Sequence, residues 1–267
     1  MFLLASAPDK GPVLSPGAPT LFEIGPIPIT NSMLYTWVVA AVIIFVIRLG
    51  TRNLSEIPTN RWQNLLELVI DGLRNLMNSM LEPKVVRWVY PLIASYFIFI
   101  LMSNLMGLLP GVGSIKYNHQ PIFRPPTADA NMTIALSAIF FFMSLWWALK
   151  YNGVLGLFQH IFGVKAPTKG LMYLFMSLIF FGVGLIEVVS LIIRPVALSM
   201  RLYGNIYGGE SVLTVMLGIG GGLIALPFYF LEIIVAIVQA VVFTMLCIAF
   251  VGTLCSHSDS HHQEAHA

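Results

Sequence analysis

The sequence predicts an all-α polytopic membrane protein with about five membrane-crossing helices and one amphipathic helix at the membrane interface. Of its 267 residues, 57% are hydrophobic and only 10% are charged, and the mean hydropathy is +0.84. Soluble domains are about a quarter charged. The charges are also unevenly spread, which leaves uncharged windows, most of them near or above the ~20 residues that a spanning helix needs. These windows are 24–47, 88–115, 130–149, 170–186, 211–231 and 233–258.

Helices are the expected spanning elements because irregular backbone does not face lipid and the windows lack the alternating pattern of an outer-membrane barrel. We treat residues 1–267 as a single integral membrane domain. The net charge of +2, with dispersed lysines and arginines, indicates no nucleic-acid partner. The two cysteines, Cys247 and Cys255, lie in or just beyond the last window and are interpreted as buried thiols.

The first elements are a tail, a crossing and an interfacial helix. Residues 1–30 contain six prolines and no sustained periodicity, which predicts a tail or short cap outside the bilayer. The first crossing is predicted over 31–48. Asn60, followed three residues later by Gln63, resembles a helix cap. From there polar residues recur on one helical face and apolar residues on the other, so 61–82 is predicted to lie in the membrane interface.

The rest of the chain reads as two helical hairpins and a tail. Windows 88–112 and 130–149 predict two crossings joined by a proline-rich loop. Residues 170–255 predict two long helices that are tilted or bent. They meet at the glycines around Gly218. The histidines in the tail, 256–267, are more typical of a polar terminus than of a metal site. We therefore expect neither a metal nor a cofactor.

The distribution of positive charge predicts the orientation. Segment 48–87 carries six lysines and arginines and 150–169 carries three, whereas 1–30 carries one and 113–129 carries two. Cytoplasmic loops are enriched in these residues. We therefore expect the N-terminus outside and the C-terminal tail in the cytoplasm, which suits a multi-pass protein of a bacterial plasma (inner) membrane.

Charged residues mark one face of the first long helix. Glu187, Arg194 and Arg201 stand at seven-residue intervals, about two turns each, and Asn205 follows one turn later. An arginine at the centre of a spanning helix costs roughly 2.5–3.5 kcal/mol, so such residues usually face protein or a water-filled cavity. A purely structural interpretation of Arg194 is also open, in which its side chain pairs with Glu187 or extends to the lipid headgroups.

A second polar set lies further along the hairpin. Glu210 is nine residues past Arg201, roughly 13 Å along the axis and on the opposite side, so the two residues could serve separate aqueous compartments. Glu232 and Gln239 stand seven apart on the last helix. Desolvation disfavours the charged form of a buried carboxyl group, which suits a proton relay. The structural alternative is that both are hydrogen-bonded packing residues.

Small and capping residues complete the set of candidates. Gly204, Gly208 and Gly209 permit close approach of another helix, either from a neighbouring subunit or within the chain. Asp129 and Asn131 begin the third crossing, where such side chains cap helices. Asn131 could also line an outer vestibule.

The run from Arg194 to Glu210, RPVALSMRLYGNIYGGE, resembles the signature of the subunit a family of F-type ATP synthases. The stretch Pro-Thr-Ala-Asp-x-Asn at 126–131, Gln239 and the order of elements support the resemblance, which covers nearly the whole chain. It implies an ion-translocating stator subunit of the Fo sector, with two offset proton half-channels that couple proton flow to ATP synthesis. Arg201 would be the essential arginine that faces the rotating c-ring.

The resemblance also implies two groups of channel residues. The outer half-channel would be lined or bordered by Glu210, Glu232, Asn131 and Gln239. The cytoplasmic exit would be near Glu187, Arg194, Ser199 and Asn205. Family members often pair a carboxylate with a histidine at the positions of Glu210 and Glu232, whereas this sequence has glutamate at both. Which of the two titrates therefore stays open.

The implied partners are the c-ring subunits, the b-subunit peripheral stalk, the rest of the ATP synthase, the lipid bilayer and the transported proton. The sequence shows no evident phosphate-binding loop, so this chain would be a non-catalytic channel subunit. One alternative is a proton-coupled secondary transporter in which Arg201 binds an anionic substrate. Another is a structural membrane scaffold. The choice between proton and sodium is left open.

Overall fold

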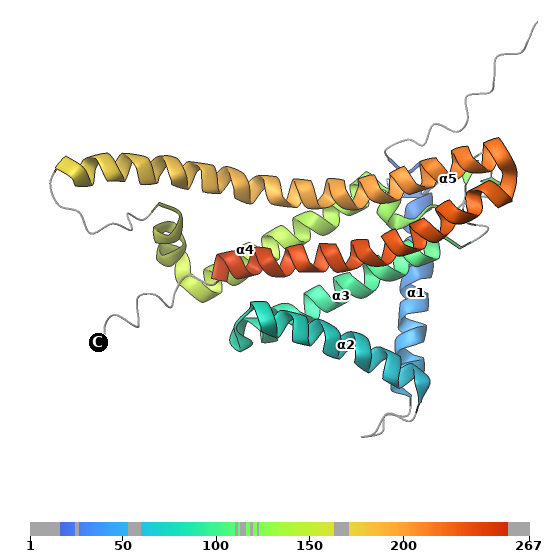
Figure 1. Cartoon of the computed structure of the whole chain (residues 1–267), viewed down its shortest axis with the longest axis horizontal. Helices are drawn as coiled ribbons and strands as arrows, with labels where there is room; N and C mark the ends of the chain where they lie inside the picture. Colours follow the sequence, from blue (N-terminus) through green and yellow to red (C-terminus); the bar gives the residue numbers. More distant parts are fainter. Residues whose placement is uncertain are drawn as a thin grey trace, which may run out of the picture.

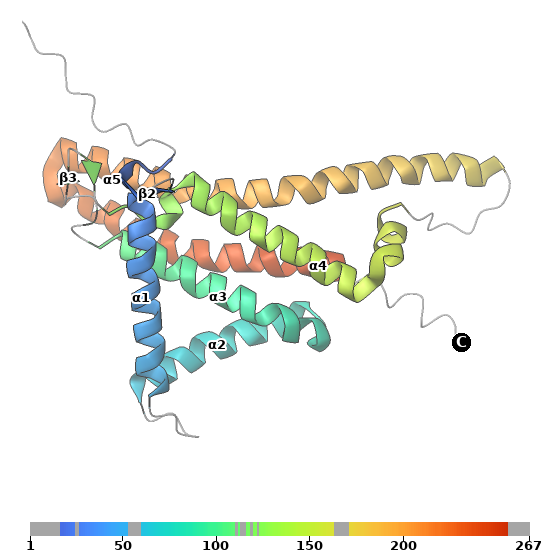
Figure 2. The same cartoon turned by 180° about the vertical axis from the view of Figure 1, so that it is seen from behind.

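The computed structural model describes residues 17–24, 27–52, 60–109, 112, 116–117, 120–121, 123–162 and 171–255. Within these residues the chain is almost entirely helical, which confirms the predicted fold class. Five helices of the described part are long and apolar enough to cross a membrane. In both views α1 crosses steeply relative to the long arms of α5, and α3 and α4 run obliquely (Figures 1 and 2).

The described chain begins with a small antiparallel hairpin rather than an irregular tail. Strand β1, Thr20–Ile24, pairs with β2, Ile27–Thr30. The β-branched threonines and isoleucines of this stretch favour extended backbone. The chain then enters α1, Asn31–Thr51, where the Thr30 side chain accepts a hydrogen bond from the Met33 backbone N–H.

The amphipathic helix forms as predicted. Helix α2, Arg61–Met80, begins at Asn60, whose side chain accepts a hydrogen bond from the Trp62 backbone N–H at 3.2 Å. Leu73 and Met77 are buried on the side that packs against α3. The helix is too polar to be among the five candidate spans.

The first helical hairpin consists of α3, Pro83–Gly107, and α4, Ala130–Phe162. The connection contains the short pair β3, Lys116–Tyr117, and β4, Gln120–Pro121, and the 3-10 helix η1, Pro126–Ala128. Helix α4 is longer than predicted. It kinks at Gly153, whose φ of 72° and ψ of 167° are accessible essentially only to glycine. Its spanning part is Ala130–Val154.

Helix α5, Leu171–Cys255, folds back on itself (Figure 1). We call its two spanning parts the first arm, Ile179–Ile219, and the second arm, Gly222–Cys255. Glycines concentrate where the arms meet, as the sequence predicted. The turn lies near η1, and this side of the molecule is called the η1 end. The opposite side is called the Gly153 end, where Asn152 donates a hydrogen bond to the Leu254 carbonyl at 2.8 Å.

The core lies between α3, α4 and the second arm. Its most deeply buried side chains include Ile93, Ile100, Phe243 and Ile248. Of the most hydrophobic 18-residue window of each arm, 44% of the second but only 11% of the first is buried. The first arm therefore covers the bundle on one side and leaves most of its own surface open. Cys247 and Cys255 are free and buried, which confirms the interpretation of both as thiols.

Candidate functional site

The site is built on the two antiparallel arms of α5. Three contacts between the arms fix how they are paired: Gly209 lies beside Glu232, Asn205 bonds Gln239, and Arg194 bonds Thr253. These contacts follow one another from the η1 end to the Gly153 end. Arg201 lies between the second and the third.

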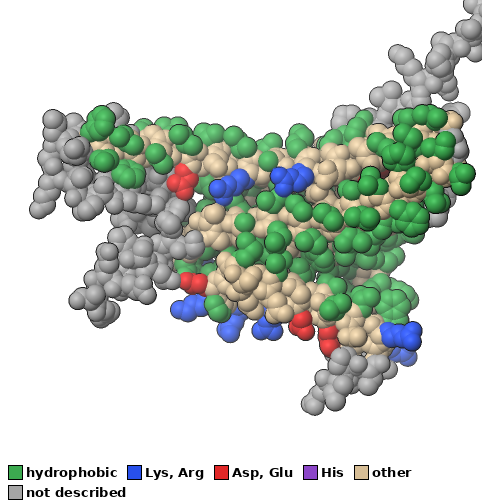
Figure 3. Space-filling view, in the orientation of Figure 1, with side chains coloured by type: hydrophobic (Ala, Val, Ile, Leu, Met, Phe, Trp, Pro, Cys, Tyr) green, Lys and Arg blue, Asp and Glu red, His purple; other side chains and the backbone are tan. Residues whose placement is uncertain are grey.

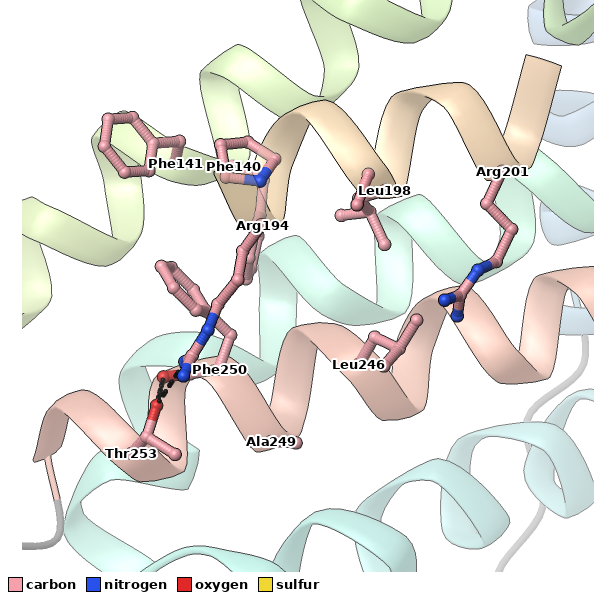
Figure 4. Close-up of a pocket in the computed structure, with 11 residues that line it drawn as sticks. Phe140, Phe141, Arg194, Leu198, Arg201, Leu246, Ala249, Phe250 and Thr253 are labelled. Carbon is pink, nitrogen blue, oxygen red and sulfur yellow. Dashed lines mark hydrogen bonds between the residues drawn. The ribbon is translucent and has the colours of Figure 1, made fainter. Parts of the chain in front are cut away.

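Arg201 projects from the first arm at the edge of a cavity of about 340 Å³ between α4 and both arms. Its guanidinium points toward the second arm (Figure 4). The residue is exposed, and among the described residues none accepts a hydrogen bond from it. The other residues that line the cavity are Phe140, Phe141, Arg194, Pro195, Ala197, Leu198, Leu246, Ala249, Phe250 and Thr253.

Arg194 lines the same cavity but is anchored. Its Nη1 donates a hydrogen bond to the Thr253 hydroxyl at 2.9 Å, and its guanidinium carbon lies 5.4 Å from the centre of the Phe250 ring (Figure 4). A cation over an aromatic face is attracted by the ring. The shared cavity confirms that Arg194 and Arg201 project from one face. Two guanidinium groups therefore face the same apolar cavity. The Arg194 group is anchored, whereas the Arg201 group has no hydrogen-bond acceptor among the described residues.

Glu187, two turns before Arg194, is half-buried and does not line the cavity. In the space-filling view, acidic and basic side chains follow one another along the first arm among hydrophobic ones (Figure 3). Ser199, by contrast, is buried with Leu198 and Leu202 on the side of the first arm that faces the bundle. The exposed and buried faces of this arm therefore carry different members of the predicted set.

At the η1 end, the two glutamates converge. Glu232 is 6% exposed, and a Cβ atom added to Gly209 would overlap its carboxyl group. Glu210 is half-buried and lies within electrostatic reach of both Glu232 and Arg124. The absence of a side chain at Gly209 is what lets the Glu232 carboxyl approach the first arm next to Glu210. Carboxyl groups that influence each other electrostatically in this way are suited to take up and pass on a proton.

Between the glutamates and Arg201, Asn205 donates a hydrogen bond to Gln239 Oε1 at 2.5 Å. Gln239 is 3% exposed, and its Nε2 has no hydrogen-bond partner among the described residues. Resemblance assigned Asn205 to the exit group and Gln239 to the outer group. The structure brings these two side chains into contact, so polar side chains connect the outer group with the exit group.

Asn131 lies further out, at the start of α4. It is exposed, and a Cβ added to Gly17 would lie 3.8 Å from its Nδ2. The neighbouring Asp129 caps the helix, because its Oδ1 accepts a hydrogen bond from the Asn131 backbone N–H at 3.1 Å. Asp129 Oδ2 also accepts a hydrogen bond from Ser32 at 2.7 Å, which ties α1 to α4.

Arg124 is a further residue near this group that was not predicted from the sequence, where it is one of the two positive charges of the loop 113–129. The side chain is 4% exposed, and its charge acts on Glu210 and Tyr203. The available signal was its position directly before two prolines and five residues before Asp129. A cation so near a helix-capping carboxylate, in a rigid stretch, is a candidate for a fixed side chain.

Comparison with known proteins gives a consistent result. The pattern of the family described as "ATP synthase A chain" matches residues 33–252. A protein named "ATP synthase subunit a" from Desulfosudis oleivorans is 35% identical over 85% of this chain and 88% of its own length. Its namesake from Trichlorobacter lovleyi is 34% identical, over 83% and 85%. That from Gloeobacter violaceus is 31% identical over 90% of each chain.

Proposed function

Because the chain belongs to the ATP synthase A chain family, we propose that Arg201 divides two offset proton half-channels at the surface where this subunit meets a ring of c subunits. Family membership makes the chain a proton-translocating component of the membrane (Fo) sector, in a complex with other F-type subunits. The division at Arg201, the identity of the ring as the neighbour and the route of the proton are the proposal.

The observation that carries the proposal is an exposed arginine on the least buried spanning arm. Arg201 stays charged in poor solvents because its guanidinium does not deprotonate in proteins. A charge of this kind is not left against lipid but faces protein or a water-filled cavity, and a neighbour with acidic groups suits it well. No described residue accepts a hydrogen bond from it, and this supports a partner outside this chain as its neighbour.

The surface beside Arg201 suits a sliding partner. Gly204 and Gly208 follow it at three and seven residues, on the same face of the helix. Within the described residues, no atom comes within 4 Å of a Cβ added at either position. Small residues allow another helix to approach closely. The strip formed by Arg201, Gly204 and Gly208 therefore has little side-chain bulk. It fits a helix of a rotating ring better than a contact within this chain.

The proposed route uses the two ends of the hairpin. A proton enters at the η1 end, through the group that contains Glu210 and Glu232, and neutralises a ring carboxylate. After rotation the carboxyl group reaches Arg201, whose charge favours ionisation, and the proton leaves past Arg194 at the Gly153 end. Arg201 also blocks direct leakage between the two openings because a proton is repelled by a fixed cation.

Energy enters from the membrane potential. One charge that crosses 100 mV yields about 2.3 kcal/mol, so several protons are combined for each ATP. This chain supplies the path, while the phosphoryl chemistry belongs to other subunits. The b-subunit stalk would hold it against rotation. The transporter alternative is not favoured, because the relatives are named as subunits of an ATP synthase.

Replacing Gly208 with valine tests the strip. The variant should fold and assemble, since an added Cβ meets no described atom within 4 Å, but it should lose most proton pumping because the side chain obstructs the ring. ATP-driven acidification of membrane vesicles measures this. Gly182→Ala, also without a neighbour within 4 Å but outside the strip, is the control and should pump normally. Normal pumping by Gly208→Val would remove the ring from this surface.

A further inference from the structure

Arg124 is a buried cation held by backbone carbonyls. Its Nη2 donates a hydrogen bond to the Ala128 carbonyl at 2.9 Å, and its Nη1 donates one to the Gly17 carbonyl at 3.3 Å. These contacts join the start of the described chain to η1. Burial of a guanidinium costs several kcal/mol unless nearby charges offset it.

The segment that carries Arg124 is fixed in place. The Pro125 ring occupies the space beside Gly107, where an added Cβ would collide with it. Helix η1 packs against α1, α3, α4 and α5, and its three residues are buried. The Arg124 guanidinium therefore has a defined position relative to both arms of α5.

The Arg124 charge reaches titratable groups of α5. Arg124 and Glu232 both act electrostatically on Glu210, and Arg124 and Asp129 both act on Tyr203. The titratable groups of this cluster thus come from both arms and from the start of α4: Glu232 and Tyr203 interact with Glu210, and Tyr207 and Asp129 interact with Tyr203. Two neighbouring carboxyl groups disfavour each other's ionisation, whereas a cation favours it. In a poorly solvated site both effects are strengthened.

We propose that Arg124 is a positioning residue for proton uptake, whose fixed charge keeps the Glu210–Glu232 pair able to release a proton toward Arg201. The inference rests on the proposed function, because it gives a role to a residue beside the proposed uptake group. Without the cation, the pair would hold its proton more tightly. The proton would then leave for the ring only at a higher pH.

A purely structural role predicts something different. If Arg124 only linked the Gly17 and Ala128 carbonyls, a neutral donor such as glutamine would lower assembly without changing how the remaining complexes respond to pH. A charge effect changes the pH response itself. The two roles are therefore separable in one experiment.

The experiment uses the assembled complex, purified with Arg124→Gln and reconstituted in vesicles. ATP synthesis is driven by a fixed potassium diffusion potential while the pH on the proton-uptake side is varied from about 5.5 to about 9. The profile of the variant should move to higher pH by about one unit, a tenfold change in proton affinity. An unchanged profile would overturn the proposal.

Further variants keep the test decisive. Arg124→Lys retains the charge, so its profile should match that of the unmodified complex even if its activity is lower. If Arg124→Gln does not assemble, Arg124→Met, another neutral side chain, is tested in its place: a profile shifted to higher pH supports the proposal, and an unchanged one overturns it. Arg87→Gln removes an exposed cation of α3 and should leave the profile in place.

Failure of this inference can be told from failure of the proposed function. If Arg201→Ala abolishes coupling at every pH while Arg124→Gln keeps the original profile, only the role of Arg124 is wrong. If Arg201→Ala leaves coupling intact, the proposed proton path itself is wrong.

Discussion

At the scale of single residues, two arginines one heptad apart have different environments. Arg194 is held by Thr253 and Phe250, and this restraint suits a wall of a channel. Arg201 has no such anchor among the described residues, which leaves its charge available to a partner. Sequence spacing predicted the shared face. It could not predict the difference, because Thr253 comes into reach only through the pairing of the two arms.

The contact between Gly209 and Glu232 gives a residue-scale prediction. In Gly209→Ala the methyl group would displace the Glu232 carboxyl group, which sits at the end of a flexible side chain, so the subunit should still assemble. Proton pumping should fall several-fold because the carboxyl group moves away from Glu210. ATP-driven vesicle acidification, compared with ATP hydrolysis by the same membranes, measures the loss.

A second substitution checks the cause. Glu232→Asp shortens the side chain by one methylene and should restore part of the pumping in the Gly209→Ala background. Gly182→Ala on the same arm, with no neighbouring atom described within 4 Å, should have no effect. Normal pumping by Gly209→Ala alone would show that the position of the Glu232 carboxyl group is not important.

At the scale of elements, hydropathy predicted the spanning helices well because the thickness of a bilayer imposes a length that uncharged windows reveal directly. The observed α1 and α2 begin at the predicted residues. Helix α4 extends beyond its window because charge does not end a helix, whereas the backbone of Gly153 does bend one. The β1–β2 hairpin was missed because two short strands leave little periodic signal.

The pairing within α5 lay beyond sequence analysis. Seven-residue spacing indicates which side chains share a face of one helix, but the partner of each depends on where the chain reverses. A shift of one residue at the glycine-rich turn would separate Asn205 from Gln239. Arg124 was missed for a similar reason, since loop side chains have no periodicity from which to infer their neighbours.

At the scale of the whole molecule, the positive charges predict that the η1 end faces outward and the Gly153 end faces the cytoplasm. Cysteine labelling tests this orientation. In intact cells a membrane-impermeant maleimide should label Leu109→Cys, which is exposed near the η1 end. Thr51→Cys, exposed at the other end of α1, should be labelled only in inverted vesicles.

The chain provides its own control for this labelling, because Cys247 and Cys255 are buried and should react slowly from either side. The reverse pattern, with Thr51→Cys labelled in intact cells, would invert the orientation. The uptake and exit groups would then exchange sides, although the contacts within the hairpin would be unchanged.

The central claim is that Arg201 acts in ion transfer and not in holding the subunit together. The most direct test is ATP-driven and respiration-driven proton pumping in vesicles that carry an assembled complex with Arg201→Ala, beside Arg74→Ala on the exposed face of α2 as a control. Coupled transport should disappear in the Arg201 variant while assembly persists, and the control should pump normally. Normal coupling in Arg201→Ala would contradict the proposed proton path.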